Sequence, residues 1–142
     1  MPTRTASATW QGGLQKGNGT FKGQTGLQGQ YNFSSRFENG AGSSPEELLA
    51  AAHAACYSMA LSVGLEQAGF TPKQVDTQAA CTVEKVGAGF KITTMRLTTR
   101  ASVPKIDEAK FQSIAAATKE GCPVSGALKN NVQMELEAKL VP

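Results

Sequence analysis

Residues 43–61 carry the sequence SSPEELLAAAHAACYSMAL, and this stretch decides the fold. Its first residues contain the usual signals of a helix start. Ser44 can cap the helix, a proline follows in the first turn, and Glu47 stands three residues after the serine, which is the spacing of a capping box. The apolar pattern continues to about Gln67, and Gly69 lies just beyond it. We therefore predict one long helix that ends near Gln67.

The middle of this helix is apolar almost all the way round and is built largely from alanine. Such a helix is expected to be buried on most sides, with other backbone close to it. The most apolar run, Leu48–Leu61, is 14 residues long and includes a histidine and a serine. Because it is too short and too polar to span a bilayer, we expect a core helix and no membrane partner.

Short strands precede the helix. The segments Thr5–Trp10, Gly19–Lys22 and Gln30–Phe37 alternate and are separated by glycine-rich turns, which predicts a small antiparallel meander. In the third strand the aromatic residues are expected on one face, with Arg36 on the other.

A mixed region follows the helix. The pattern predicts two paired strands joined by a glycine turn, then two helices and a closing strand: Val75–Val86, Phe90–Val103, Asp107–Lys119, a short helix near Pro123, and Val132–Leu140. This order of strands, buried helix, strands, helices and strand indicates an α+β protein. A length of 142 residues with 40% hydrophobic composition suffices for one domain over residues 1–142.

The composition excludes several classes of protein. Fourteen basic and eleven acidic side chains leave a net charge of +3, and charged residues make up only 18% of the chain, with no run of like charge. This argues against nucleic-acid binding and against a polybasic membrane surface. The first ten residues, MPTRTASATW, lack an apolar signal core, so we expect a cytoplasmic protein. In that reducing compartment three cysteines are better explained as reactive thiols or core residues than as structural bridges.

The three cysteines differ in their surroundings. Cys122 stands where a new helix begins, with Pro123 in its first turn, and unpaired N–H groups there favour a thiolate. The Cys-Pro-Val-Ser sequence is half of a thioredoxin-like redox motif, but no βαβ unit is evident around it. Cys56 lies in the middle of the long helix, where most cysteines are inert, and Cys81 lies on a strand, where we expect it to pack. One histidine and three scattered cysteines make a zinc site improbable, and we expect no metal and no organic cofactor.

Two further residues of the long helix are candidates. His53 precedes Cys56 by three residues, so the two could form a Cys–His pair, although a histidine held by a backbone group or a subunit contact is the commoner case. Glu47 is used by the capping box, whereas Glu46 has no local role. Because Glu46 and Cys56 are ten residues apart, they lie about 15 Å apart on one helix. Glu46 could serve the thiol only from a second chain or through an intermediary such as Arg36.

Three stretches carry a family resemblance: NFSSRFE at 32–38, SPEELLAAAHAACYSMAL at 44–61 and EGCPVS at 120–125. Together they closely resemble the osmotically inducible protein C (OsmC) family, which includes the organic hydroperoxide resistance proteins. The resemblance covers essentially the whole chain, and the His-Ala-Ala-Cys stretch is similar to the osmotically inducible subgroup.

The resemblance implies a thiol-dependent peroxidase that works as an intertwined homodimer with its sites at the subunit interface. By position, Cys56 would be the peroxidatic cysteine and Cys122 the resolving one, while Arg36 and Glu46 would form the polar pair that activates Cys56. The cycle would pass through a Cys56 sulfenic acid and a Cys56–Cys122 disulfide, with a low-molecular-weight or lipoyl-type dithiol as reductant. His53 is not shared by the sister subgroup, which counts against a required base at that position.

A guanidinium near the thiol is expected to lower the Cys56 pKa, with Glu46 holding Arg36 through a bidentate bridge. Apolar walls would favour organic hydroperoxides over hydrogen peroxide, and the candidate wall residues are Leu49, Ala52, Met59 and Phe37. Two alternatives remain open: a redox sensor or binding protein that uses the cysteine pair as a switch without turnover, and a structural stress-induced dimer with incidental thiols.

Overall fold

The computed structural model describes all 142 residues. The chain divides into two compact units, residues 1–47 and residues 48–142, and each is described by itself. The expectation of one domain over residues 1–142 stays a prediction. The fold class is confirmed, because helices and mostly antiparallel strands alternate in the predicted order, which makes the protein α+β.

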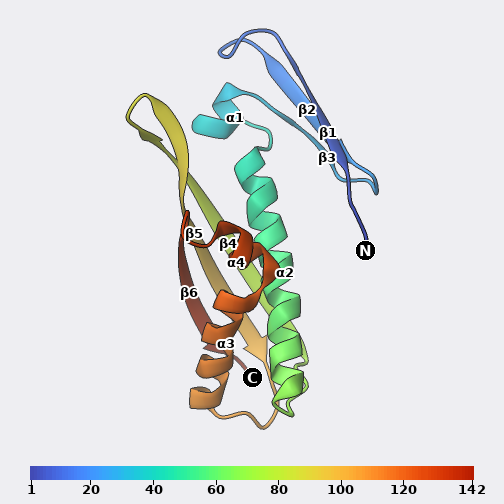
Figure 1. Ribbon diagram of the computed structural model, residues 1–142, viewed down its shortest axis with the longest axis vertical. Coiled ribbons are helices and arrows are strands. Elements are labelled where there is room, and N and C mark those ends of the chain that lie inside the picture. Colours follow the sequence, from blue (N-terminus) through green and yellow to red (C-terminus); the bar gives the residue numbers. More distant parts are fainter. The chain divides into compact units, whose positions relative to one another are not determined.

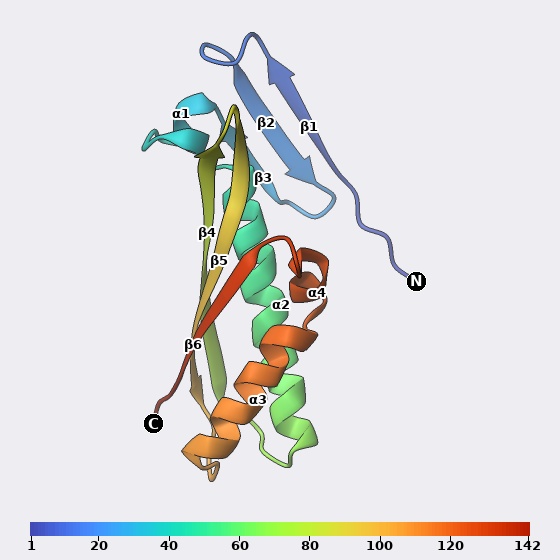
Figure 2. The same cartoon turned by 60° about the vertical axis from the view of Figure 1, so that its left-hand side comes forward.

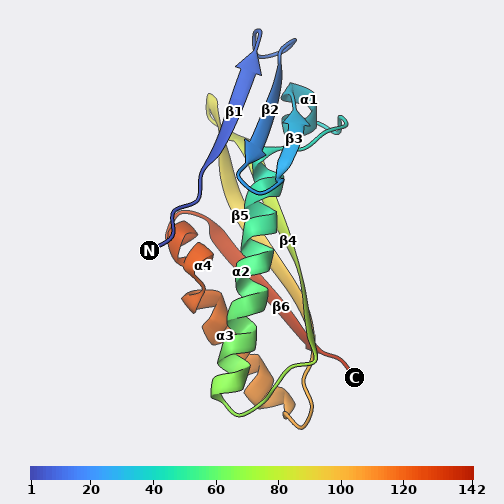
Figure 3. The same cartoon turned by 90° about the vertical axis from the view of Figure 1, so that its right-hand side faces the viewer.

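The first unit contains a three-stranded antiparallel sheet. Its strands are β1 (Ala6–Gln11), β2 (Asn18–Gly23) and β3 (Gln28–Tyr31), in the order β1-β2-β3 (Figure 3). The Trp10 and Tyr31 rings lie 5.5 Å apart over Gly19. A Cβ atom at Gly19 would lie 2.5 Å from the Tyr31 ring, so only glycine lets the two aromatic rings meet there.

The predicted third strand, Gln30–Phe37, is wrong in its second half. The strand ends at Tyr31, and a short helix, α1 (Phe33–Phe37), follows. The reason is a capping box that the alternation of apolar residues obscured: the Ser35 N–H donates to the Asn32 side chain, and the Asn32 N–H donates to the Ser35 hydroxyl, each at 2.8 Å. The aromatic residues therefore share a helix side instead of a strand face.

The long helix, α2, spans Pro45–Gln67 as predicted. The Glu47 N–H donates to the Ser44 hydroxyl at 3.1 Å, so Ser44 caps the helix. The reciprocal half of the expected capping box is replaced, because the Glu47 carboxylate accepts a bond from the Ser43 hydroxyl at 2.6 Å. Beyond the helix, Gly69 has a φ of +92°, the left-handed conformation that ends many helices.

The two sides of α2 differ sharply in burial. One ridge, at four-residue spacing, is buried: His53, Tyr57, Leu61 and Leu65. A second ridge of small and apolar residues is exposed: Ala52, Ala55, Met59 and Val63. The expectation that α2 is buried on most sides is therefore wrong for the single chain, because one small sheet and one further helix cover only one side of it.

By length and composition α2 could cross a membrane, since it has 23 residues and a mean hydropathy of 1.6 in its most apolar window. The run Leu48–Leu61, which alone is too short to span a bilayer, has only 14 residues and is part of this longer helix. Core helices meet the same criterion, and the buried ridge of α2 belongs to the core of residues 48–142.

The second unit is a three-stranded sheet with helices on one face (Figure 2). Its strands are β4 (Gln74–Val86), β5 (Gly89–Ser102) and β6 (Gln133–Leu140), and its further helices are α3 (Glu108–Gly121) and α4 (Pro123–Leu128). The β4–β5 hairpin is antiparallel, as predicted, whereas β6 pairs with β5 in parallel. The path from β5 through α3 and α4 to β6 is thus a βαβ crossover, and the expectation that no such unit surrounds Cys122 is wrong.

The core of this unit lies between the sheet and the side-by-side helices α2 and α3 (Figures 1 and 2). The Tyr57 hydroxyl donates to the Ala115 carbonyl at 2.9 Å and so links the two helices. The Ser58 hydroxyl donates to Thr77 at 2.8 Å and so links α2 to β4. The largest apolar members of the core are Tyr57, Leu61, Leu65, Met95, Leu97 and Phe111.

The substitution Leu61→Ala should lower the free energy of unfolding by about 2–5 kcal/mol, because it removes a fully buried side chain and leaves a cavity. Urea denaturation followed by circular dichroism measures this change. Leu27→Ala is the matched control, since Leu27 is 52% exposed, and it should cost less than about 1 kcal/mol. Equal losses in the two variants would contradict the assignment of Leu61 to the core.

Candidate functional site

Cys122 lies at the junction of two helices, as the sequence predicted for a residue that opens a helix. It ends α3, with its N–H donating to the Thr118 carbonyl at 3.0 Å, and it is the N-cap of α4, with Pro123 in the first turn. Its sulfur accepts a bond from the Ser125 N–H at 3.4 Å. Because one residue caps both helices, its backbone is held on both sides. The residue is only 1% exposed.

Cys56, half-buried on α2, is brought to this junction. The Cys122 thiol and the backbone of Val124 both lie close enough to the Cys56 sulfur to act on its pKa. Both are thiols in this structure. Two cysteines 66 residues apart in the sequence therefore meet, which a disulfide between them requires.

The Cys56 pKa is raised, and not lowered as expected. Burial is the largest cause, since it disfavours the thiolate, and the charge of neighbouring Cys122 acts in the same direction. The Val124 N–H acts against them and does not outweigh them. None of the groups that act on this thiol is a cation. Residues 48–142 therefore provide no guanidinium that would lower the Cys56 pKa as expected.

His53 does not pair with Cys56. Its ring is fully buried, Nε2 lies 2.8 Å from the Ser125 hydroxyl, and Nδ1 has no hydrogen-bond partner. Burial lowers the His53 pKa, so the ring is neutral at pH 7. The hypothesis of a Cys56–His53 pair is wrong, and the alternative of a backbone partner is also wrong, because a side chain of α4 holds the ring.

Cys81 packs against the core from β4, as predicted. No group of three or more histidine, cysteine, aspartate or glutamate side chains is arranged to hold a metal ion.

Arg36 and Glu46 form an ion pair within residues 1–47. Arg36 Nε lies 3.0 Å from Glu46 Oε1, and Glu46 is only 5% exposed. The bridge uses one carboxylate oxygen, since Glu46 Oε2 has no hydrogen-bond partner, so the expected bidentate bridge is not formed. The two glutamates at the start of α2 do divide their roles as predicted, with Glu47 at the cap and Glu46 on Arg36.

An aromatic pocket of about 290 Å³ has Arg36 among its lining residues. The Arg36 Cζ atom lies 4.9 Å from the centre of the Phe37 ring, and the Phe33 and Phe37 rings are 5.3 Å apart. The pocket is lined by Trp10, Leu14, Tyr31, Asn32, Phe33, Arg36 and Phe37. Among these apolar walls only Phe37 was predicted from the sequence, because the other residues come together only once α1 forms.

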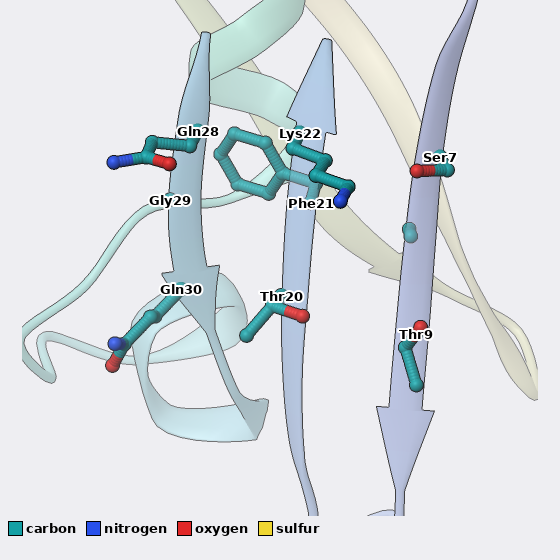
Figure 4. A pocket seen from close by; sticks show the side chains of 9 residues that line it. Ser7, Thr9, Thr20, Phe21, Lys22, Gln28, Gly29 and Gln30 are labelled. Carbon is teal, nitrogen blue, oxygen red and sulfur yellow. The ribbon is translucent and has the colours of Figure 1, made fainter. Parts of the chain in front are cut away.

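Two other hollows differ in chemistry. The larger, about 530 Å³, lies on the β1-β2-β3 sheet, and Lys22 is its one ionisable side chain (Figure 4). Another, about 490 Å³, is lined by residues of α2 and α3 and by Cys122. Its walls include Ala60 and Val63 of α2, whereas the predicted wall residue Met59 is 73% exposed.

Comparison with known proteins identifies the family. The family model described as OsmC-like protein matches residues 38–137. The peroxiredoxin OsmC of Escherichia coli (strain K12) is 44% identical over 138 residues, which cover 96% of each chain. The chain belongs to the OsmC-like protein family. The organic hydroperoxide resistance protein OhrB of Bacillus subtilis (strain 168) is 34% identical over 103 residues, which cover 72% of this OsmC-like chain and 74% of OhrB.

Solved structures agree with the OsmC-like assignment. The crystal structure of OhrB from Bacillus subtilis has a TM-score of 0.67 at 27% identity and covers 95% of this chain and 98% of that one. An OsmC-like protein from Mycoplasma pneumoniae has a TM-score of 0.76, with 99% of each chain covered, and its 14% identity shows the fold alone. The resemblance predicted from the motifs is thus confirmed.

Ser125 is the residue that the sequence analysis missed in this OsmC-like protein. Its hydroxyl lies 3.1 Å from the Cys122 sulfur as well as 2.8 Å from His53. A signal was present, because serine replaces the second cysteine of the half redox motif, and a polar residue three positions after a helix cap faces the cap.

We expect Cys122→Ser to lower the midpoint pH at which Cys56 becomes reactive toward iodoacetamide. The substitution removes the neighbouring thiolate charge that raises the Cys56 pKa. Alkylation rates between pH 6 and 10, with peptide mapping to identify the labelled cysteine, measure the midpoint. Cys81→Ser is the control and should leave it unchanged. An upward shift in Cys122→Ser would contradict the contact described here.

Proposed function

We propose that this OsmC-like protein is a thiol-dependent peroxidase that reduces organic hydroperoxides, and hydrogen peroxide less well, under oxidative or osmotic stress. The observation that carries the proposal is the contact between the Cys56 and Cys122 side chains. The names of the relatives, peroxiredoxin OsmC and organic hydroperoxide resistance protein OhrB, support a peroxidase-like role.

The proposed cycle uses the two sulfurs in turn. The Cys56 thiolate attacks the terminal peroxide oxygen, the O–O bond breaks, and the alkoxide takes a proton and leaves as an alcohol. Cys56 becomes a sulfenic acid, and Cys122 displaces its hydroxyl as water to form the Cys56–Cys122 disulfide. A dithiol, such as one of lipoyl type, then restores both thiols by exchange. The cycle uses no metal and no organic cofactor.

The raised Cys56 pKa means that the cycle needs a cation. Each unit by which a thiol pKa is lowered corresponds to about 1.4 kcal/mol of preference for the thiolate. Arg36 is the proposed source, because a guanidinium carries five N–H donors and the bond to Glu46 uses only its Nε. The remaining donors could face the thiolate and the departing oxygen, while Glu46 fixes the orientation.

We propose that Arg36 and Glu46 act on the Cys56 of a second copy of the chain. Glu46 and Cys56 both belong to α2, and ten residues of helix separate them by about 15 Å. The exposed apolar ridge of α2, which includes Ala55 and Met59, supports a homodimer, since a continuous apolar ridge is costly to leave in water. In such a dimer each site would combine residues of both subunits.

The aromatic pocket around Arg36 supports a preference for peroxides with organic tails. Its Phe33 and Phe37 rings offer apolar surface beside the one cation of the pocket. An alkyl or aryl tail could lie on the rings while the peroxide oxygens meet the guanidinium. We further propose that the protein works in the cytoplasm on small molecules, without nucleic-acid or membrane partners.

Wild-type protein should consume cumene hydroperoxide with dihydrolipoamide as reductant, and Cys56→Ser should lose this activity by at least about 100-fold, because the attacking sulfur is gone. Steady-state peroxide assays measure the rate. Cys81→Ser, which also removes a thiol, is the control and should keep it. Cys122→Ser should complete one turnover and then stall. If the wild type turns over no faster than Cys56→Ser, the redox-sensor alternative replaces the peroxidase.

A mixing experiment tests the crossed arrangement. Arg36→Ala and Cys56→Ser proteins, each strongly impaired alone, should together recover about a quarter of the wild-type rate after subunit exchange. Half of the dimers are then mixed, and each mixed dimer has one complete site. Native mass spectrometry verifies that mixed dimers are present. Mixed dimers without recovered activity would show that Arg36 serves its own subunit, and a purely monomeric protein would contradict the homodimer.

A further inference from the structure

The Ser125 hydroxyl lies between two groups that can exchange a proton. It is 2.8 Å from His53 Nε2 on one side and 3.1 Å from the Cys122 sulfur on the other. His53 and Ser125 are fully buried, and Cys122 is nearly so. The three groups therefore form a continuous hydrogen-bonded chain from α2 to the junction of α3 and α4.

A hydroxyl has one hydrogen, so Ser125 can donate to only one of its two neighbours and must accept from the other. In one arrangement the Cys122 S–H donates to Ser125, and the Ser125 O–H donates to His53. In the other the His53 Nε2–H donates to Ser125, and the Ser125 O–H donates to the Cys122 sulfur. When the ring already carries a proton on Nδ1, passing from the first arrangement to the second moves one proton from Cys122 to His53 and leaves a Cys122 thiolate and a His53 imidazolium.

The surroundings of these three hydrogen-bonded groups allow both arrangements. His53 Nδ1 has no hydrogen-bond partner, so no partner of that nitrogen fixes the tautomer of the ring. The Ser125 N–H also donates to the Cys122 sulfur, which favours the sulfur when it is anionic. Burial lowers the His53 pKa, which leaves the ring neutral and able to accept a proton at pH 7.

Two other titratable groups act near Cys122, and neither is suited to take its proton. Tyr57 donates its hydroxyl to the Ala115 carbonyl, and burial followed by the charge of Cys122 raises its pKa, so it stays protonated. Cys56 is the sulfur that Cys122 must attack. His53 is thus the one base that the hydrogen-bonded chain reaches.

We infer that Ser125 and His53 form a proton relay that activates Cys122 for disulfide formation. This inference rests on the proposed function, in which Cys122 resolves the oxidised Cys56. Ser125 touches the reacting sulfur and is a catalytic residue, while His53 acts through it.

The relay step balances as follows. The Cys122 S–H proton passes to the Ser125 oxygen, and the Ser125 proton passes to His53 Nε2. The electron pair released on the Cys122 sulfur forms the S–S bond with Cys56, and the Cys56 S–O bond breaks. The departing hydroxide takes up the proton that His53 releases and leaves as water. Cys122 is oxidised and the Cys56 sulfenic acid is reduced in the same event.

The same path runs in reverse when the disulfide is opened. A reductant thiolate that attacks the Cys56 sulfur expels Cys122 as a thiolate. The proton that the reductant thiol lost then reaches the Cys122 sulfur through His53 and Ser125. The relay thus serves the resolving cysteine in both halves of the cycle and leaves the first attack by Cys56 to other groups.

The test measures closure of the disulfide without any peroxide. In a Cys81→Ser background, 5,5′-dithiobis(2-nitrobenzoate) loads Cys56 with a thionitrobenzoate group, and attack by Cys122 then releases that group. Stopped-flow absorbance at 412 nm follows the second release. We expect Ser125→Ala and His53→Gln to slow it by about 10-fold or more at pH 7, because a general base typically contributes 10²–10⁴-fold.

Controls separate a relay from a structural role. Ser125→Thr keeps the hydroxyl and should keep the rate within about 3-fold, and Ser58→Ala, which removes another α2-to-neighbour hydroxyl bond, should leave it unchanged. Raising the pH to 9.5 should restore the rate of both relay variants, since a thiol that ionises in solution needs no base. Wild-type closure rates in Ser125→Ala and His53→Gln would overturn the inference, and so would slow closure that high pH does not restore.

A second measurement distinguishes this inference from the proposed function. With one equivalent of cumene hydroperoxide, Ser125→Ala should form the Cys56 sulfenic acid at the wild-type rate and hold it longer, as dimedone labelling and mass spectrometry would detect. If the wild type forms no sulfenic acid, the peroxidase proposal fails while the closure experiment still decides the relay. If sulfenic acid forms and disappears equally fast in both proteins, the relay is wrong and the peroxidase stands.

Discussion

The bond between the Ser125 hydroxyl and His53 joins residues that are 72 positions apart, and it ties the helix that carries Cys56 to the turn that Cys122 caps. It holds the first turn of α4 against the buried ridge of α2, and Cys122 caps that same turn. Both partners are fully buried, so neither could turn to water if the other were lost. The bond therefore adds to the caps of α3 and α4, which hold the Cys122 backbone themselves, in keeping this turn beside α2.

Two parts of the proposed chemistry are built in different ways. The thiols stand on long elements of residues 48–142, with backbone held by α2 and by the α3–α4 junction. The cation stands on α1, a helix of five residues held by an Asn32 capping box and by the ion pair with Glu46. The raised Cys56 pKa disfavours its thiolate, so the proposed cycle depends on the cation.

Local signals in the sequence predicted most of the fold. The remaining features depend on contacts between distant residues, which have no local signal. The limits of α2, the β4–β5 hairpin and the helix start at Cys122 follow from caps, glycines and alternation, which act over a few residues. Alternation failed at Phe33–Phe37, where the Asn32 cap overrides a pattern that suits a strand equally well. The parallel pairing of β6 has no local signature, and neither has Ser125, because both depend on elements that meet only after folding.

The serine of the Cys-Pro-Val-Ser turn has a consequence for how the chain stores an oxidation event. A cysteine at that position would offer Cys122 a partner within its own turn, and the bond would close a tiny ring that leaves the rest of the molecule untouched. With serine there, the neighbouring sulfur is on α2, 66 positions away. A cross-link across such a span lowers the conformational entropy of the unfolded chain, which raises its free energy by roughly 4 kcal/mol. In the proposed cycle, oxidation would therefore make the protein more stable against unfolding until the disulfide is reduced.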